Sequence, residues 1–204
     1  RESGEIQHRV VLSKDFYMSK YPITFKQYDK FCEATGRQKP DDYTWGRENR
    51  PVIDVSWDDA VAFCEWIGCR LPTEAEWEYA CKAGTTTPFN TGDNLTTDEA
   101  NYDGNYPYNN NEKGTYRKKT VPVGTLGKPN AWGLCDMHGN KNGAPIGTLN
   151  IVQQTKSLPT RKVPIMVHIA YCVVAAGPLV LCSAAVPIVV ASNPAVAWTM
   201  LDSV

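Results

Sequence analysis

The chain divides at residues 133–140, Gly-Leu-Cys-Asp-Met-His-Gly-Asn, which close its regularly patterned part. Of its 22 acidic residues, 21 precede Lys141 and only Asp202 follows it. Five of its six tryptophans also lie before this point. Such a change is unusual within one globular domain. The sequence therefore indicates that two different compositions are joined at Asn140.

The length and charge of the chain limit its fold and its partners. Its 204 residues suit one domain large enough to bury a sizeable core. The formal net charge of -1 gives no electrostatic footprint for nucleic acid or for an anionic membrane surface. We therefore expect no nucleic-acid partner, and the sequence leaves the oligomeric state open.

The cysteines bear on metal binding and on the compartment. They are too scattered for a zinc site, because no two Cys-x-x-Cys pairs match. Their odd number permits disulfides together with a free thiol. The chain starts at Arg1 without a recognisable leader, so the compartment stays open, with an extracytoplasmic location favoured over a cytoplasmic one. The seven are Cys32, Cys64, Cys69, Cys81, Cys135, Cys172 and Cys182.

Local patterns predict a strand pair and a helix at the start of the chain. Short apolar segments at Val10–Leu12 and Phe16–Ser19 flank a turn and suit two paired strands. Thr24 then stands as a helix N-cap before residues 25–34, whose apolar side chains fall at helical spacing. Gly36 ends this helix.

Two more helices follow, each announced by a capping sequence. Pro51–Val55 is a candidate for a short buried strand. Ser56, with Asp59 three residues on, caps a second helix that ends at Gly68. Thr73 caps a third that ends at Gly84, and its glutamates are explained by capping and by the helix dipole rather than by acid–base catalysis.

Residues 85–120 lack periodicity but are rich in Asn, Asp, Gly and Tyr. A long irregular stretch in a compact domain is usually functional or disordered, and its aromatic residues argue against disorder. Oxygen donors at Asn101, Asp103 and Asn105 suggest a calcium site. On composition alone, a solvated Asn-rich loop explains the stretch equally well.

No recognisable catalytic set stands out. His138 has no second histidine nearby in sequence, so a surface histidine is favoured over a ligand or a base. The cysteines on the predicted helices are favoured as core or disulfide residues. Ser-His-Asp sets, phosphate-binding glycine loops and metalloprotease helices are absent from the sequence.

Five motifs follow one another over about residues 5–140, at residues 16–24 (FYMSKYPIT), 51–57 (PVIDVSW), 70–80 (RLPTEAEWEYA), 121–124 (VPVG) and 130–140 (NAWGLCDMHGN). In order and spacing they resemble the formylglycine-generating enzyme, or sulfatase-modifying factor, family. The resemblance implies an α+β fold of the C-type-lectin-like kind, with little regular secondary structure. It also implies a protein or peptide substrate or ligand.

The resemblance further implies metal ions. Asn101 and the Tyr102 carbonyl, with the backbone near Tyr116, match one structural calcium site of the family. Asp136 and the Gly139 carbonyl match half of a second, which the family completes after Asn140. Catalytic members also bind copper through two cysteines. Copper is therefore expected only if those cysteines were restored, and no catalytic residue is carried over.

After Asn140 the family pattern is lost, but it reappears in another reading frame. If residues 141–144 are encoded AAG-AAT-GGT-GCN, reading from the third base gives Glu-Trp-Cys, as in the family. The same offset permits Leu-Arg-Gly-Gly-Ser-Trp at residues 171–177 and Gly-Phe-Arg at 201–204. We infer that residues 1–140 are the start of a family domain and that 141–204 are an out-of-frame tail replacing its end.

This hypothesis bears on the apolar run and on function. Residues 169–191 are long enough to span a bilayer, but an accidental apolar run in a wrong frame is favoured over a membrane span. Two functions remain: a family enzyme whose catalytic part is missing here, or a noncatalytic binding and display protein of the retroelement-diversified type. Fold-level analogy does not choose between them.

Overall fold

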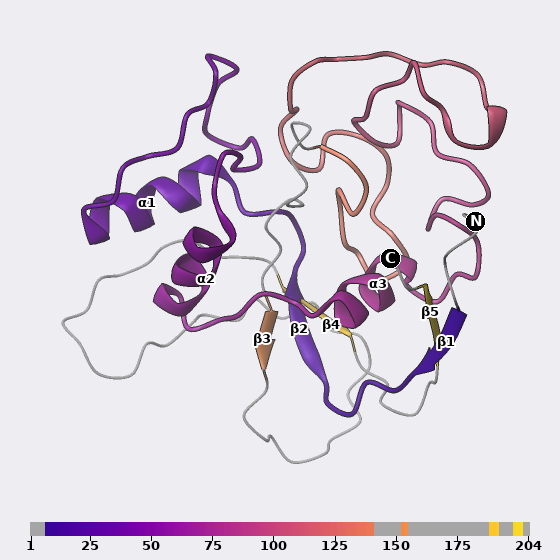
Figure 1. Ribbon diagram of the computed structural model, residues 1–204, viewed down its shortest axis with the longest axis horizontal. Coiled ribbons are helices and arrows are strands. Elements are labelled where there is room, and N and C mark those ends of the chain that lie inside the picture. Colours follow the sequence, from indigo (N-terminus) through magenta and orange to yellow (C-terminus); the bar gives the residue numbers. More distant parts are fainter. Residues whose placement is uncertain (1–6, 141–151, 155–187, 192–197, 202–204) are drawn as a thin grey trace.

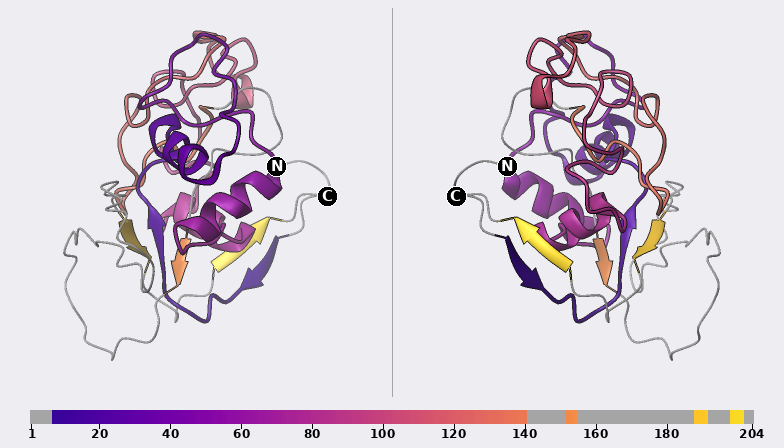
Figure 2. Two further views of the ribbon diagram at one scale, coloured as in Figure 1. Left: turned by 90° about the vertical axis from the view of Figure 1, so that its left-hand side faces the viewer. Right: turned by 90° about the vertical axis from the view of Figure 1, so that its right-hand side faces the viewer.

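The computed structural model describes residues 7–140, 152–154, 188–191 and 198–201, and it contains short helices and strands joined by long loops. The low content of regular secondary structure agrees with the prediction. In Figures 1 and 2 the strands gather at one end of the molecule and the loops of residues 85–140 at the other. The elements are β1 (Gln7–Val10), β2 (Phe16–Ser19), α1 (Phe25–Thr35), α2 (Trp57–Trp66), α3 (Glu74–Lys82), the 3-10 turn η1 (Tyr108–Asn110), β3 (Val152–Gln154), β4 (Ile188–Ala191) and β5 (Trp198–Leu201).

The strands form two small antiparallel sheets, ordered β1-β5 and β3-β2-β4. β1 pairs with β5, with His8 opposite Met200, and β2 lies between β3 and β4, with Tyr17 opposite Gln153 and Val190. The predicted pairing of the first two strands with each other is therefore wrong. Their partners come from distant parts of the chain, which local patterns do not reveal.

All three helices begin at the predicted caps. Thr24, Ser56 and Thr73 each accept a hydrogen bond from the backbone N–H three residues on, and in each case the side chain at that third position returns a bond to the cap. At the start of α1, the third residue of this capping box is Gln27, which was not predicted from the sequence. Local chemistry alone thus defines where each helix starts.

The first core lies between α1 and α2. Tyr28 and Phe63 stack with ring centroids 5.3 Å apart, and Phe31 meets Phe63 edge-on at 5.6 Å. Val52 and Ile53 are buried against this cluster. The predicted strand at residues 51–55 is wrong: only an isolated bridge joins Pro51 to Thr24, because the segment packs by its side chains rather than along a sheet.

The second hydrophobic core lies between β2, α3 and residues 133–140. It packs Phe16 and Met18 of β2 against α3 and against Leu134 and Met137. Trp132 meets Tyr79 edge-on at 4.8 Å. Residues 133–140 are therefore anchored on one side by the hydrophobic core.

Membrane insertion was considered for residues 169–191. This run lies outside the described residues except for β4. Within the described residues, no helix is both long enough and apolar enough to cross a membrane.

The start of α3 carries the most enclosed ion pair among the described residues. Glu76 accepts two hydrogen bonds from the Arg70 guanidinium, at 2.7 and 2.6 Å, and one from the Thr73 backbone N–H at 2.9 Å. Burial alone raises the pKa of Glu76, but Arg70 and Thr73 outweigh it and hold that pKa below its usual value. The glutamate is a structural residue, as its place in the capping box predicts.

Glu76→Gln should lower the free energy of unfolding by about 1–2 kcal/mol at neutral pH, because it removes the charge from these hydrogen bonds. Since the pKa of Glu76 is lowered on folding, its contribution is present above the unfolded-state pKa and is lost as pH falls through the folded value. Urea unfolding at neutral and acidic pH measures both effects. Glu65→Gln, at an exposed site on α2, should change stability by less than about 0.5 kcal/mol. Equal losses in the two variants would contradict the assignment.

Candidate functional site

Three segments meet at the buried side chain of Asn140. Its Oδ1 accepts hydrogen bonds from the Val121 backbone N–H at 2.9 Å and from Asn101 Nδ2 at 3.2 Å. Its Nδ2 donates to the Val121 carbonyl at 3.1 Å, and its backbone N–H donates to the Asn101 carbonyl at 2.8 Å. Asn140 is 1% exposed. One amide therefore fastens residue 101, residue 121 and the end of the 133–140 turn together.

Glycine is required where this turn touches residue 101. Gly139 has φ 67° and forms an isolated parallel bridge with Asn101. A side chain at Gly139 would collide with the Asn101 carbonyl. The bridge brings together residues that the sequence assigned to two separate calcium sites.

Asp136 is a half-buried carboxylate with few compensating contacts. Its Oδ2 accepts a hydrogen bond from the Gly124 backbone N–H, and within the described residues no cation pairs with it and no donor reaches Oδ1. Burial raises the pKa of Asp136, and the Gly124 bond only partly offsets this. A bound cation would relieve this cost, so the side chain fits half of a calcium site.

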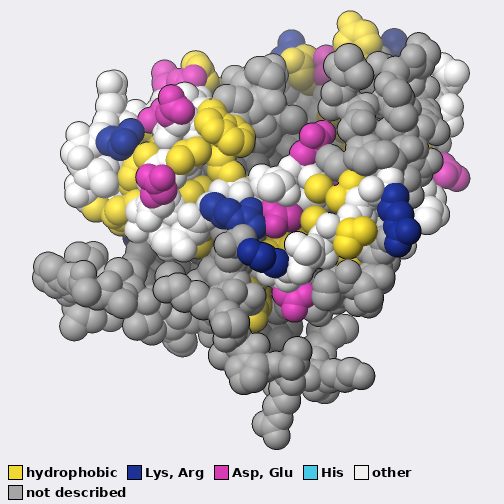
Figure 3. All heavy atoms as spheres, turned by 60° about the horizontal axis from the view of Figure 1, so that its bottom comes forward, with side chains coloured by type: hydrophobic (Ala, Val, Ile, Leu, Met, Phe, Trp, Pro, Cys, Tyr) yellow, Lys and Arg dark blue, Asp and Glu magenta, His cyan; other side chains and the backbone are white. Residues whose placement is uncertain are grey.

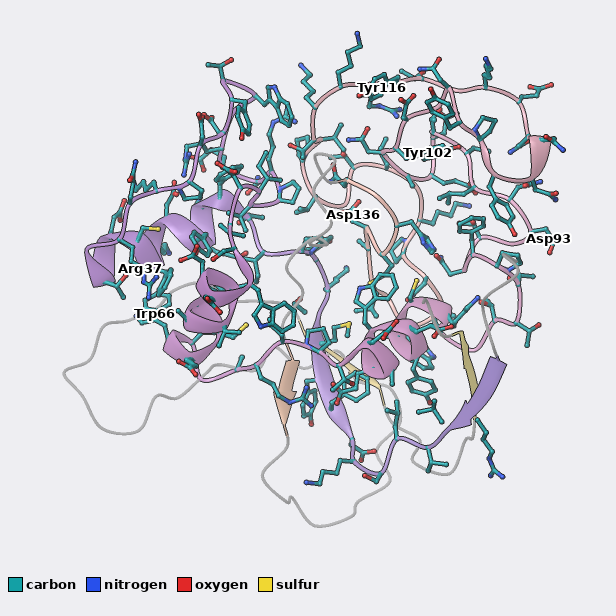
Figure 4. The ribbon with its side chains drawn as sticks, viewed as in Figure 1. Arg37, Trp66, Asp93, Tyr102, Tyr116 and Asp136 are labelled. Carbon is teal, nitrogen blue, oxygen red and sulfur yellow. The ribbon has the colours of Figure 1, made fainter. Side chains whose placement is uncertain are left out.

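The other predicted site comprises Asn101, Tyr102 and the backbone near Tyr116; Figure 4 labels Tyr102, Tyr116 and Asp136. Asn101 Nδ2 donates to the Lys119 carbonyl at 2.8 Å as well as to Asn140, while no donor in the described chain reaches its Oδ1. The Tyr102 hydroxyl donates to the Leu95 carbonyl at 2.8 Å. Tyr116 faces Asp103 in an isolated antiparallel bridge. An amide oxygen and nearby carbonyls are donors of the kind that calcium takes.

The cluster of oxygen donors at residues 101–105 has a simpler explanation than a metal. Asp103 Oδ1 accepts from the backbone N–H and the side-chain amide of Asn105, at 3.0 and 2.8 Å. These two residues form a local turn in which the carboxylate is already bonded. Asp103 and Asn105 thus need no ion to account for them.

His138 is half-buried and enclosed by contacts rather than freely exposed, so the prediction of a surface histidine is only partly right. Its Nε2 lies 2.7 Å from Asn90 Oδ1 and 3.7 Å from Cys81 Sγ. The Phe89 ring meets it edge-on at 5.3 Å. Burial, together with the charge of Lys82, lowers the pKa of His138 to about 4. The imidazole is therefore neutral at physiological pH and packs as part of the fold.

The described cysteines behave as core residues. Cys32, Cys64 and Cys81 are buried free thiols, as expected, while Cys69 is a half-buried free thiol packed against the first core. Cys135 is also a buried free thiol. Burial raises the pKa of Cys64 and of Cys81 to about 12, so both thiols are protonated at neutral pH when no metal is bound. Within the described residues, no group of three His, Cys, Asp or Glu side chains is placed to hold a metal. Cys172 and Cys182 lie outside those residues.

Fold and site together define a loop-rich α+β domain whose oxygen-donor turns are held by buried asparagines. The sequence matches the sulfatase-modifying factor enzyme 1-like domain over residues 2–142, which is more than half of the chain. The chain belongs to this family.

Similar proteins support the family assignment, and the aligned lengths show how much of each of them the chain covers. Formylglycine-generating enzyme of Mus musculus is 30% identical over 191 aligned residues, covering 69% of this chain and 51% of the relative. The Mycobacterium tuberculosis enzyme of the same name is 44% identical over 98 residues, covering 46% and 32%. Mus musculus inactive C-alpha-formylglycine-generating enzyme 2 is 36% identical over 92 residues, covering 44% and 30%. The chain thus spans about half or less of the length of these relatives.

The half-buried His138 side chain predicts that the free energy of unfolding depends on pH. Its pKa is about 4 in the fold and 6.5 in an ordinary setting, so the unfolded chain binds the proton more tightly. Its contribution is complete above the unfolded value and falls as the pH drops from 6.5 towards 4, by on the order of 3 kcal/mol. His138→Gln, whose side chain stays neutral, should flatten this part of the curve in urea unfolding across that range. Parallel curves for the two proteins would show that His138 is not buried in solution.

Proposed function

We propose that this chain derives from a formylglycine-generating enzyme, which oxidises a cysteine of a protein substrate to formylglycine, and that its reading frame shifts after Asn140. The observation that carries the proposal is the end of the family match at residue 142, two residues past Asn140. The acidic residues and the tryptophans become scarce at the same point. Three family motifs recovered in one alternative frame explain why.

The 204-residue chain is then catalytically inactive. The chemistry needs paired thiolates that hold copper, and the resemblance carries none of the family's copper-binding cysteines over to the described part of the chain. The codons that would encode the copper ligands lie in the shifted part. The proposed loss of activity therefore results from the shifted residues 141–204 and not from a defect in residues 7–140.

A noncatalytic binding or display protein is the second candidate. One relative is itself named an inactive formylglycine-generating enzyme, so likeness over this part of the domain does not select the chemistry. The two candidates differ in the restored frame. An oxidase requires paired cysteines between its Gly-Gly-Ser-Trp and Gly-Phe-Arg motifs, whereas a diversified display protein requires many adenine-derived variable codons.

We also propose that the domain has a C-type-lectin-like fold stabilised by calcium. Asn101, Tyr102 and Tyr116 would supply oxygens to one ion, and Asp136 with the Gly139 carbonyl would supply half of a second. The unbonded Asn101 Oδ1 and the under-compensated Asp136 carboxylate support both assignments. The ions would act on stability, because they neutralise buried charge and fasten loops with few hydrophobic contacts.

Millimolar calcium should raise the melting temperature by roughly 2–8 °C, which corresponds to about 1–3 kcal/mol of linked binding. Asp136→Asn should lose the part of this rise that depends on the half-site, and the remainder reports the site at Asn101. Asp93→Asn, at an exposed position (Figure 4), is the matched control and should keep the whole rise. A melting temperature that does not respond to calcium would refute both ions.

The frame and the lost activity are tested together. The gene should read AAT at Asn142, TGC at Cys172, GTG at Val173 and Val174, and GCT at Ala176, and two disagreements would refute the shift. The purified 204-residue chain with copper should not convert a Cys-x-Pro-x-Arg peptide, whereas the frame-restored protein should do so. Turnover by the unrestored chain would show that it is not inactive. An inactive but well-folded restored protein would favour the binding function instead.

A further inference from the structure

Residues 104–114 form a compact loop whose two ends meet. The Gly114 backbone N–H donates to the Gly104 carbonyl at 2.9 Å, and Asp103 bridges Tyr116 just outside this contact. A side chain at Gly104 would collide with the Gly114 backbone, so the close approach requires glycine. Surface loops of this length with joined ends are often functional.

The base of the loop is fastened to the body of the domain. The Thr115 backbone N–H donates to Thr97 Oγ1 at 3.0 Å, and Arg117 donates to the Thr97 carbonyl at 2.8 Å. Tyr108 meets Phe89 edge-on, with ring centroids 5.1 Å apart. The loop is therefore held in one arrangement before any partner arrives, which reduces the entropy lost on binding.

The loop presents tyrosines to solvent from a strained backbone. Tyr106 is 80% exposed and Tyr108 is 41% exposed, and Tyr116, two residues past the end of the loop, is 47% exposed. Asn109 and Asn110 both have left-handed φ values, 51° and 55°. Rigid exposed tyrosines among asparagines and glycines are the composition of protein-binding loops, and backbone strain gathers at functional sites.

The charge of this surface is opposite to that of the whole chain. Residues 105–119 contain four basic side chains and one acidic one, against a net charge of -1 overall. Within the described residues, no acidic group pairs with Lys113, Lys118 or Lys119. On the face drawn in Figure 3, by contrast, described Lys and Arg side chains are interspersed with Asp and Glu.

We propose that residues 104–119 are a recognition loop for an acidic peptide segment of another protein. Exposed tyrosines supply apolar area with hydroxyl groups at its edge, and the lysines, which pair with no carboxylate among the described residues, supply charge complementary to an acidic partner. Four basic residues in a chain of net charge -1 do not make the strongly basic surface of a nucleic-acid site, so a peptide fits better. The proposal rests on these contacts and does not depend on formylglycine chemistry.

The test selects binders on the full 204-residue chain from a display library of random peptides about a dozen residues long. Enriched peptides should be acidic relative to the input, and their affinity is then measured by fluorescence anisotropy. Tyr106→Ser and Lys113→Glu should each weaken binding about tenfold, because both side chains lie on the loop. Lys14→Glu, exposed in the connection between β1 and β2, is the charge-matched control and should stay within about twofold.

Several outcomes would overturn the proposal. These are enrichment of peptides with no acidic bias, equal losses in Lys14→Glu and Lys113→Glu, or full affinity in Tyr106→Ser. Tighter binding of single-stranded oligo-dT than of the selected peptides would assign the surface to nucleic acid instead. Self-association that the loop variants abolish would assign it to a second copy of the chain. Circular dichroism melts of every variant ensure that a loss of binding is not a loss of folding.

Discussion

The loop half of this domain depends on one buried amide, the side chain of Asn140. It bonds both the N–H and the carbonyl of Val121, which replaces a strand partner where no strand exists. Each of these groups would carry a desolvation cost of about 1–3 kcal/mol if it were buried without a partner. With few helices and strands to satisfy the backbone, long loops need such side-chain partners. Asn130 plays a similar part, since it accepts from the backbone of Trp132 and Leu134 and donates to the Ala80 carbonyl.

The helices could be predicted from the sequence because their limits are set within a few residues. A cap and its third following residue, as at Ser56 and Asp59, lie in one short window. The strands could not be predicted in the same way. β2 pairs with residues 152–154 and 188–191, and nothing in its own four residues specifies those partners. The prediction of a strand at Pro51–Val55 was wrong for a different reason. Its apolar side chains pack into the first core, but its backbone forms only an isolated bridge.

The candidate site was likewise predictable only where its contacts are close in sequence. The family resemblance singled out Asn101 and Asp136 as calcium ligands, and this stays a prediction; it did not indicate the bridge that joins Asn101 to Gly139. His138 was misjudged because its neighbours Cys81 and Asn90 lie 57 and 48 residues away in sequence. A lone histidine beside a glycine shows no local sign of burial. The oxygen donors of Asp103 and Asn105 suggested a calcium site. In the structure these two residues, two positions apart, bond each other, so no ion is needed to account for them.

The position of Asn140 bears on what a shifted frame, if present, would remove. Among the described residues, the groups that the Asn140 side chain bonds belong to Asn101 and Val121, which both precede it in the chain. Residues 188–191 and 198–201 pair with β2 and β1 through their backbones. Catalysis differs from such pairing, because it requires particular side chains at particular atoms. A change of frame after Asn140, as proposed, would therefore remove side-chain chemistry encoded after Asn140 and leave the contacts of Asn140 with Asn101 and Val121 in place.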